Sequence, residues 1–236
     1  MPNESPTTRT PVFARRAILR ALALSPVATL VPGLARAAAE KAGLVSANVC
    51  MLTPETSEGP FYVDPRLVRA DITEGRSGAP LELRMQVVTA DCRPIEGARV
   101  DIWHCDAEGL YSGYADQLGG LDMRGETFLR GTQMTGRDGI AHFTTIWPGW
   151  YPGRTAHVHY KVFLGRSETL TSQLFFPDGA SEAVYARAEP YRARENARYL
   201  PNARDGIARR AGEGAFAEIA EHGAGYRATL VVGVAA

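Results

Sequence analysis

Two histidines separated by a single residue are the most chemically suggestive feature of this sequence. His157 and His159 lie at the start of a run, residues 158–164, whose composition is typical of a strand. Successive side chains on a strand alternate between its faces, so the two imidazoles point the same way. They supply half of a metal site, and Tyr151 on the preceding Pro/Gly-rich turn offers a third ligand. The alternative is a surface histidine pair, but with only five histidines in the chain this spacing favours metal binding.

The remaining donors near this pair are phenols rather than carboxylates. Tyr151 lies on the turn, while Tyr111 and Tyr114 lie in a long Gly-rich loop, residues 105–127. Phenolate is a hard anionic oxygen ligand, which favours ferric over ferrous iron. Two phenolates and a hydroxide would neutralise Fe(III) and make a buried site tolerable. On spacing alone, each tyrosine equally fits a packing or surface role.

Seven short segments with strand character must position these side chains. Apolar and polar residues alternate over residues 81–87, which predicts a half-buried strand. The other strand candidates are residues 100–104, 128–135, 140–146, 158–164, 170–176 and 226–234. Arg137-Asp138-Gly139, between two of them, is a hairpin signal. Together they predict an all-β fold, an antiparallel β-sandwich with long loops and a few short helices in residues 181–220.

The composition is that of a soluble globular protein with many turns. Of its 236 residues, 45% are hydrophobic and 22% charged, and the chain has 24 glycines and 15 prolines. Basic and acidic residues balance at 26 each, so there is no electrostatic case for nucleic-acid binding. We expect residues 38–62 to form an extended N-terminal arm and residues 63–236 a single sandwich domain. The long loop at residues 105–127 is expected to be functional.

The N-terminus has the pattern of an export signal. Arg15-Arg16 precedes an apolar stretch that runs to about Leu34, and Ala35-Arg36-Ala37 is an A-x-A cleavage candidate. We therefore expect residues 1–37 to be a twin-arginine-type signal and the mature protein to be periplasmic or extracellular. The stretch is short and interrupted by prolines, so no membrane helix is expected to remain after cleavage. A disordered tail is the alternative.

Export permits disulfide bonds among the three cysteines, Cys50, Cys92 and Cys105. Cys92 and Cys105 would lie about 20–25 Å apart if the intervening strand is extended, which disfavours a bond between them. Cys50 could pair with either, or all three could be free thiols. None has the spacing of a zinc site.

Ordered motifs over residues 52–236 give the sequence a family resemblance. They are Glu58-Gly59-Pro60-Phe61-Tyr62, then Val100-Asp101-Ile102-Trp103-His104-Cys105-Asp106-Ala107-Glu108-Gly109-Leu110-Tyr111-Ser112, Arg130-Gly131-Thr132-Gln133, Phe143-Thr144-Thr145-Ile146-Trp147-Pro148-Gly149-Trp150-Tyr151, Arg154-Thr155-Ala156-His157-Val158-His159, and Gln173-Leu174-Phe175-Phe176. In these motifs the chain resembles the intradiol ring-cleavage dioxygenases, including their exported single-chain branch. The β-sandwich of that family agrees with the strand count.

The resemblance implies one Fe(III) per chain and a defined set of site residues. Its ligands would be Tyr111 rather than Tyr114, with Tyr151, His157 and His159. It also implies catalytic roles for Tyr151, Arg154 and Gln173. Tyr151 would leave the iron and accept a substrate proton, Arg154 would stabilise negative charge on the substrate, and Gln173 would orient Arg154 or contact the same region.

The implied reaction uses O₂ to cleave a catechol-type ring between its two hydroxyl-bearing carbons, giving a muconate-type diacid. The partners would be a small aromatic diol and O₂. The turn from Tyr151 to Arg154 is shorter than in the protocatechuate-cleaving enzymes, so the sequence leaves the choice among catechol, a substituted catechol, protocatechuate and hydroxyquinol open. It also leaves open whether the chain forms a homo-oligomer.

Two other functions fit parts of the same pattern. A non-catalytic β-sandwich binding module is one, since this architecture hosts many functions, and it predicts a colourless protein. A zinc-dependent hydrolase using His157 and His159 is the other, and it predicts bound zinc without visible absorption. The other histidines, His104, His142 and His222, are expected to be structural.

Overall fold

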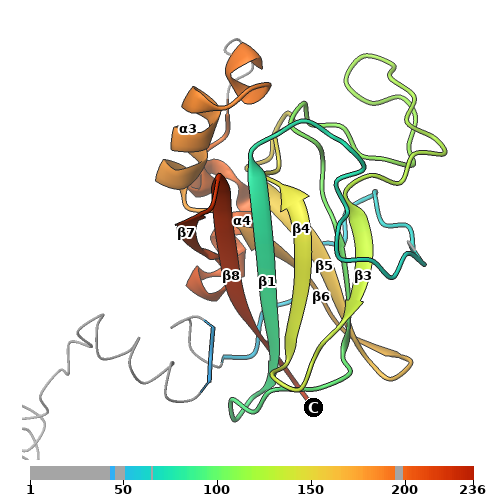
Figure 1. Cartoon of the computed structure of the whole chain (residues 1–236), viewed down its shortest axis with the longest axis vertical. Helices are drawn as coiled ribbons and strands as arrows, with labels where there is room; N and C mark the ends of the chain where they lie inside the picture. The colour runs from blue at the N-terminus through green and yellow to red at the C-terminus, as the bar shows by residue number, and fades with distance from the viewer. Residues whose placement is uncertain (1–42, 46–50, 65, 195–198) are drawn as a thin grey trace, which may run out of the picture.

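Two four-stranded sheets, packed face to face, contain all the strands of the described chain (Figure 1). The computed structural model describes residues 43–45, 51–64, 66–194 and 199–236. The first sheet, here called the β1 sheet, has the order β4 (Ile140–Ile146), β1 (Pro80–Thr89), β8 (Gly225–Val234) and β7 (Glu218–His222). The second, the β5 sheet, has the order β3 (Arg130–Met134), β2 (Arg99–Trp103), β5 (His157–Leu164) and β6 (Ser167–Phe175).

Alternation of side chains decides which residues enter the core between the sheets. On β5, Val158, Tyr160 and Val162 are fully buried members of the main hydrophobic cluster. They pack against the apolar residues of β1, where Leu83 and Met85 are likewise fully buried. Because successive side chains of a strand take opposite faces, the odd-numbered residues of β5 point to the outer face of the β5 sheet. The two histidines of the H-x-H pair lie on that face.

The sandwich predicted from the sequence is confirmed, with two corrections to its details. Strand β7 begins at Glu218, inside the range 181–220 where only short helices and loops were expected, and ends at His222, so the described chain has eight strands rather than seven. The pairing of β1 with β8 is parallel, whereas the other pairs are antiparallel. These two strands are the first and the last of the described strands along the chain, so no tight turn joins them and constrains their relative direction.

The hairpin predicted at Arg137-Asp138-Gly139 is wrong. The turn forms, with the Gly139 amide donating to the Gly136 carbonyl at 2.9 Å. However, β3 pairs with β2 in one sheet and β4 pairs with β1 in the other. The turn therefore carries the chain from one sheet to the other, because burial of both strands' apolar faces outweighs local pairing.

Between β6 and β7, the described residues 178–194 and 199–215 contain five short helices. They are α3 (Asp178–Arg187), η2 (Tyr191–Arg194), η3 (Asn202–Arg204), α4 (Gly206–Ala211) and η4 (Glu213–Ala215). Figure 1 draws α3 in orange at the upper left of the view, and its Tyr185 packs on Trp150, in the turn before β5, with ring centroids 4.5 Å apart. The side chain of Asp205 caps α4 by accepting the amides of Ile207 and Ala208.

The arm was predicted at residues 38–62, and the described residues 51–62 of it run without helix or extended pairing across the outer face of the β5 sheet. This segment begins on β8, where the Thr53 amide donates to the Gly233 carbonyl at 2.9 Å, and continues along β6, where Thr56 donates to the Thr171 carbonyl at 3.0 Å. Lys161 on β5 then binds the Glu58 carboxylate at 2.5 Å. The outer face of the β5 sheet is thereby covered.

Two of the sequence predictions fall wholly or partly outside the described residues. The predicted signal, residues 1–37, and Cys50 both lie there. Among the described cysteines, Cys105 is a buried free thiol and Cys92 is disulfide-bonded. Within the described residues, no helix combines the length and apolar character needed to cross a membrane.

Candidate metal centre

The two histidines of β5 bring their Nε2 atoms together on the outer face of the β5 sheet, beneath the arm that covers it. His157 Nε2 and His159 Nε2 are 3.0 Å apart, and each side chain is only 1% exposed. The Nδ1 atom of His157 lies 2.6 Å from the Thr155 carbonyl, which can only accept a hydrogen bond. That contact places the proton on Nδ1 and leaves Nε2 with a free lone pair, the form that binds a metal.

Two phenols complete a cluster of four donor atoms around His157. Tyr111 Oη lies 3.3 Å and Tyr151 Oη 3.1 Å from His157 Nε2. Tyr111 arrives from the long loop after β2 and is 1% exposed, whereas Tyr151 lies on the turn before β5 and is only partly buried. The structure thus brings together all four residues predicted to be metal ligands.

The spacing and chemistry of these four atoms fit a single metal ion. Two ligands each about 2.1 Å from one ion, at angles of about 90–110°, lie about 3.0–3.4 Å apart, and the three measured separations are 3.0, 3.1 and 3.3 Å. Nδ1 of His159 is buried without a hydrogen-bond partner among the described residues. Two imidazole nitrogens and two hard phenol oxygens are a donor set suited to ferric iron.

Aromatic packing fixes the orientation of the ligand rings. Trp103, which pairs with His159 in the β2–β5 register, stacks on its imidazole with centroids 5.1 Å apart and planes 9° from parallel. Phe61 of the arm stacks in the same way on Tyr111, at 4.3 Å and 14°. Gly59 passes so close that a Cβ there would lie 3.2 Å from Cε1 of His159, at a positive φ of 71°. The arm therefore forms one wall of the site.

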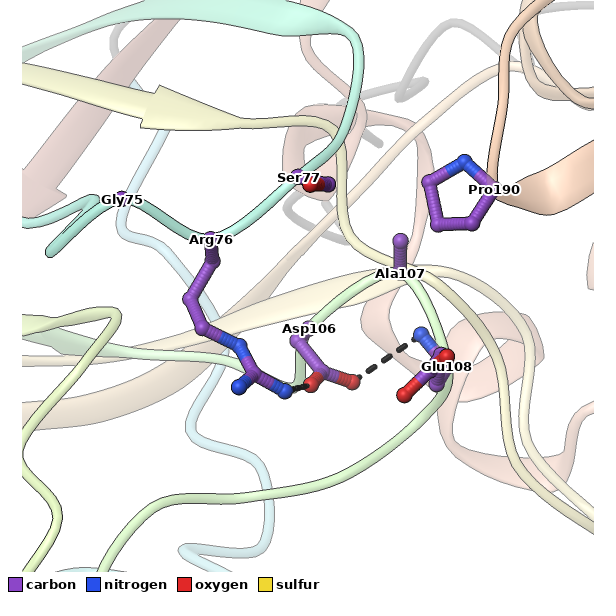
Figure 2. A pocket seen from close by; sticks show the side chains of 7 residues that line it. All are labelled: Gly75, Arg76, Ser77, Asp106, Ala107, Glu108 and Pro190. Carbon is purple, nitrogen blue, oxygen red and sulfur yellow. Dashed lines mark hydrogen bonds and ion pairs between the residues drawn. The ribbon is translucent and has the colours of Figure 1, made fainter.

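A buried carboxylate anchors the loop that delivers Tyr111. Asp106 Oδ1 accepts the amides of Glu108 and Leu110, both at 2.9 Å, and its other oxygen forms an ion pair with Arg76. Figure 2 shows this pair at the edge of a cavity of about 290 Å³, with the Asp106 carboxylate between the Arg76 guanidinium and the Glu108 amide. Asp106 closes a tight turn immediately before Tyr111 and so sets where that tyrosine leaves the backbone.

Arg154 and Gln173 meet at the open side of the cluster. Nη2 of Arg154 donates to Gln173 Oε1 at 2.5 Å, and Nη1 lies 3.4 Å from Tyr151 Oη. Gln173, fully buried on β6 opposite His159, donates from Nε2 to the Ser57 carbonyl of the arm at 2.7 Å. Its amide orientation is thus fixed from both ends, and its oxygen holds the Arg154 cation near the phenol.

Burial keeps all four donors neutral in the absence of a cation. It raises the pKa of Tyr111 well above its ordinary value and that of Tyr151 to about 12, despite the opposing charge of Arg154. Burial also lowers the pKa of His157 to about 3, and that of His159 well below its usual range. Deprotonation of the phenols would therefore require a strongly charged cation between them.

Comparison with known proteins identifies the family. A family model described as a dioxygenase matches residues 57–188, more than half of the chain, and that range contains every predicted site residue. An intradiol ring-cleavage dioxygenase from Tetranychus urticae is 32% identical and superposes with a TM-score of 0.73, covering 79% of this chain and 95% of the other. The chain belongs to the intradiol ring-cleavage dioxygenase family. Members of this family use non-haem iron.

The curated relatives of this dioxygenase are named for their catechol-type substrates. Catechol 1,2-dioxygenase 1 of Acinetobacter lwoffii is 32% identical over 144 residues, covering 51% of this chain and 45% of the relative. Chlorocatechol 1,2-dioxygenase of Cupriavidus pinatubonensis is 31% identical over 146 residues, covering 52% and 54%. The chain therefore spans about half the length of these curated relatives.

The sequence alone did not predict a role for several residues that shape the site of this dioxygenase. Asp106 and Trp103 lie in the family motifs, but nothing in those motifs indicates what they contact. Asp205 lies far from any motif. No sequence signal was available for Asp205, because its contact with Arg154 joins segments 51 residues apart. Residues 111 and 114 were separable only by motif, and the structure turns Tyr114 away, its hydroxyl donating to the Tyr62 carbonyl at 2.9 Å.

The described histidines outside the site have structural contacts. His104 is fully buried, with Nδ1 2.8 Å from the Cys105 carbonyl and Nε2 2.7 Å from Thr145 Oγ1. His142 and His222 lie at the surface of the β1 sheet. Among the described residues, no group of three or more His, Cys, Asp or Glu side chains could hold a metal ion. The candidate centre differs from such a group because half of its donors are phenols.

Proposed function

We propose that this chain is an iron-dependent intradiol dioxygenase that cleaves a catechol-type ring between its two hydroxyl-bearing carbons, using O₂, to give a muconate-type diacid. The observation that carries this proposal is the convergence of two phenol oxygens and a second imidazole nitrogen within 3.0–3.3 Å of His157 Nε2. Family membership supports the same reaction. The named substrates of the relatives point to catechol and chlorinated catechols as the first compounds to test.

The proposed centre holds one Fe(III) per chain on Tyr111, Tyr151, His157 and His159. When bound, ferric iron supplies a Lewis acid that binds the diol and withdraws electron density from its ring. The protein's part is to hold two anionic and two neutral ligands at fixed spacing in a dry pocket. Both histidines are nine-tenths or more buried, so the donors need no reorganisation when the metal enters.

The two tyrosines are suited to different tasks. Tyr111 is 1% exposed and stacked under Phe61, so its ring has no room to move. Tyr151 is partly exposed, sits on a turn, and has Arg154 Nη1 3.4 Å from its hydroxyl. With a metal bound, Tyr111 would be the fixed ligand. Tyr151 would be the ligand free to leave the metal, and its Oη could then accept a proton from one substrate hydroxyl.

Arg154 and Gln173 bind and orient the substrate. The Arg154 cation lies beside the position that an aromatic diol would occupy next to Tyr151 Oη, where it stabilises negative charge on the ring. Gln173 keeps that cation in place through its 2.5 Å hydrogen bond to Nη2. No described carboxylate forms a hydrogen bond with any of the four donor side chains, so proton transfer is assigned to the phenol of Tyr151.

The test is oxygen uptake by the iron-loaded protein against a panel of catechol, 4-chlorocatechol, protocatechuate and hydroxyquinol. We expect one O₂ consumed per diol, a muconate-type product, and a red-brown protein owing to phenolate-to-iron charge transfer. A colourless protein that binds zinc and consumes no O₂ with any of these diols would contradict the proposal. Bound zinc would favour the zinc-hydrolase alternative. A metal-free, inactive protein would favour the binding-module alternative.

We also propose that residues 1–37 direct export through a twin-arginine-type signal. Arg15-Arg16, the apolar stretch and the Ala35-Arg36-Ala37 site support this. Export of the folded protein would allow iron to be loaded in the cytoplasm. The measurement is fractionation of cells expressing the full chain or an Arg15→Lys, Arg16→Lys variant. Retention of both proteins in the cytoplasm, without cleavage near Ala37, would contradict the proposal.

A further inference from the structure

Asp205 is a buried carboxylate that the proposed reaction does not use. It stands between η3 and α4, 51 positions after Arg154, and its side chain is 1% exposed. A carboxylate so completely buried carries a large desolvation cost unless its charge is paired and hydrogen-bonded. Its partners therefore indicate what this charge does in the folded protein.

Both oxygens of Asp205 are fully engaged. Oδ2 accepts from Arg154 Nε at 2.8 Å and from the Thr155 amide at 3.0 Å. Oδ1 accepts from the amides of Ile207 and Ala208, at 2.7 and 3.1 Å. These bonds outweigh burial, so the pKa of Asp205 lies below its ordinary value. With each oxygen holding two donors, the carboxylate has no free position for a substrate and can act only through its partners.

The partner that matters to the site is Arg154. Its guanidinium is planar, and each of its three nitrogens has a separate partner: Nε faces Asp205, Nη2 faces Gln173, and Nη1 faces Tyr151. Asp205 is the only charged member of this set and is fixed by the first turn of α4. Holding the Nε edge therefore fixes the plane of the group and aims the other two nitrogens at the site.

We propose that Asp205 is the positioning residue of Arg154, holding the guanidinium by its Nε edge so that its two remaining nitrogens face Tyr151 and Gln173. The inference rests on the proposed function for the role of Arg154 toward substrate, while the geometry it describes does not. It links α4, which contributes nothing else to the four-donor cluster, to the reaction.

The matched control comes from the same segment. Asn202, on η3, accepts from the Thr155 hydroxyl at 2.8 Å and donates to the Phe176 carbonyl at 2.7 Å, so it docks residues 199–208 without touching Arg154. Asp205→Asn keeps the shape but places an NH₂ against N–H donors. Asn202→Ala loosens the segment alone, so it reports what loss of docking does by itself.

The first experiment is steady-state kinetics with iron-loaded wild type, Asp205→Asn and Asn202→Ala, using catechol. We expect kcat to fall by about 10- to 100-fold in Asp205→Asn, the range found when a partner that orients an active-site group is lost. KM and iron content should change by less than about threefold. Asn202→Ala should lower Tm comparably yet keep its kcat. An equal loss of kcat in both variants, at an equal loss of Tm, would overturn the positioning role.

A double-mutant cycle sharpens the assignment. Lysine has no Nε edge, so in an Arg154→Lys background Asp205→Asn should lower kcat by less than about twofold. An effect of full size in that background would show that Asp205 acts on something other than Arg154 and would overturn the proposal.

Crystal structures of wild type and Asp205→Asn test the geometry independently of activity. We expect the Arg154 guanidinium to leave Gln173 Oε1 in the variant while Tyr111 and both histidines stay in place. An unmoved guanidinium would overturn the proposal even if the protein is an active dioxygenase. Wild-type protein that consumes no O₂ would overturn the proposed function, while the same pair of structures would still decide the role of Asp205.

Discussion

The two outer faces of the sandwich each carry a pair of histidines, yet only one is built to hold a metal. On the β5 sheet, His157 and His159 are 1% exposed and meet two phenols. On the β1 sheet, the side chains of His142 and His222 are 50% and 48% exposed. The arm and loops that cover the first face are what separates the two pairs.

The charged side chains beside the two histidine pairs also differ. Glu82 lies between His142 and His222, but its carboxylate also binds Arg227 at 2.8 Å, so its negative charge is already paired with a guanidinium. Beside the four donors, the Arg154 guanidinium is held by Asp205 at its Nε edge, away from Tyr151. Burial, neutral imidazoles and two converging phenols distinguish the metal centre, whereas the presence of two neighbouring histidines alone does not.

The largest expected effect is loss of the metal. His157 contacts each of the other three donors, so His157→Ala should abolish iron binding and colour. Turnover should fall by more than about 100-fold, which is the loss typical of removing a residue that only hydrogen-bonds to a metal ligand. Iron analysis and the visible spectrum measure this. His222→Ala, the control on the opposite face, should retain iron, and equal iron in the two variants would refute the ligand assignment.

The two tyrosines should be separable by substitution. Tyr151→Phe should keep iron, shift the visible band and slow turnover by about 10- to 100-fold, because a proton acceptor is lost. Tyr111→Phe should lose more iron, since this ligand is fully buried. Tyr114→Phe is the matched control and should leave the spectrum unchanged. A spectrum of Tyr151→Phe identical to wild type would count against the phenolate.

Acid should destabilise the protein through buried histidines. Burial lowers the pKa of His104 from 6.5 to about 4, so between these values the unfolded chain binds a proton that the folded chain does not. Stability is therefore lost as pH falls below 6.5, by about 2 kcal/mol from His104 at pH 5. Urea unfolding at pH 7 and pH 5 measures it, and His104→Gln should reduce the difference. An undiminished difference in that variant would contradict this origin.

A methyl group on the arm should disturb the covered face. At Gly59, alanine would add a Cβ 3.2 Å from His159 and strain a backbone at φ 71°. We expect a loss of about 1–2 kcal/mol in stability and weaker iron binding. Gly165→Ala, in the turn between β5 and β6, is the matched control, since φ is 61° there and no heavy atom lies within 4 Å of the added carbon. Iron affinity reduced equally in both would point to strain alone.

The smallest effect belongs to the exposed pair. His222→Gln and Glu82→Gln should each change the free energy of unfolding by less than about 0.5–1 kcal/mol, because solvent screens surface ion pairs. Denaturant unfolding in low and high salt measures this. A loss of several kcal/mol would mean that the cluster on the β1 sheet is more than a solvated ion-pair network.

The ligand strand was predictable because its information is local. Alternation placed His157 and His159 on one face, and the burial of Val158, Tyr160 and Val162 in the core on the other face confirms this. Strand β7 gave no such signal, since its residues 218–222 are almost all exposed and lack alternation. The hairpin failed for the opposite reason: its turn residues are right, but the sandwich assigns β3 and β4 to different sheets.

The surroundings of the site were not predictable because they join distant segments. Asp205 meets Arg154 across 51 residues, and Ser57 meets Gln173 across 116. Such contacts depend on where loops cross a finished sheet, which no periodicity reports. Motifs could name the four donors, whereas the residues that aim them became visible only with the fold.

The arm that walls the metal centre is fastened to the last strand of the sheet on the far side of the sandwich. Thr53 receives the Gly233 amide on its hydroxyl and returns its own amide to the Gly233 carbonyl. The arm is thus bonded to both sheets, because Thr56 and Ser57 are held by β6 while Thr53 is held by β8. A change in β8, a strand that contributes none of the four donors, can therefore reach the metal centre through the arm.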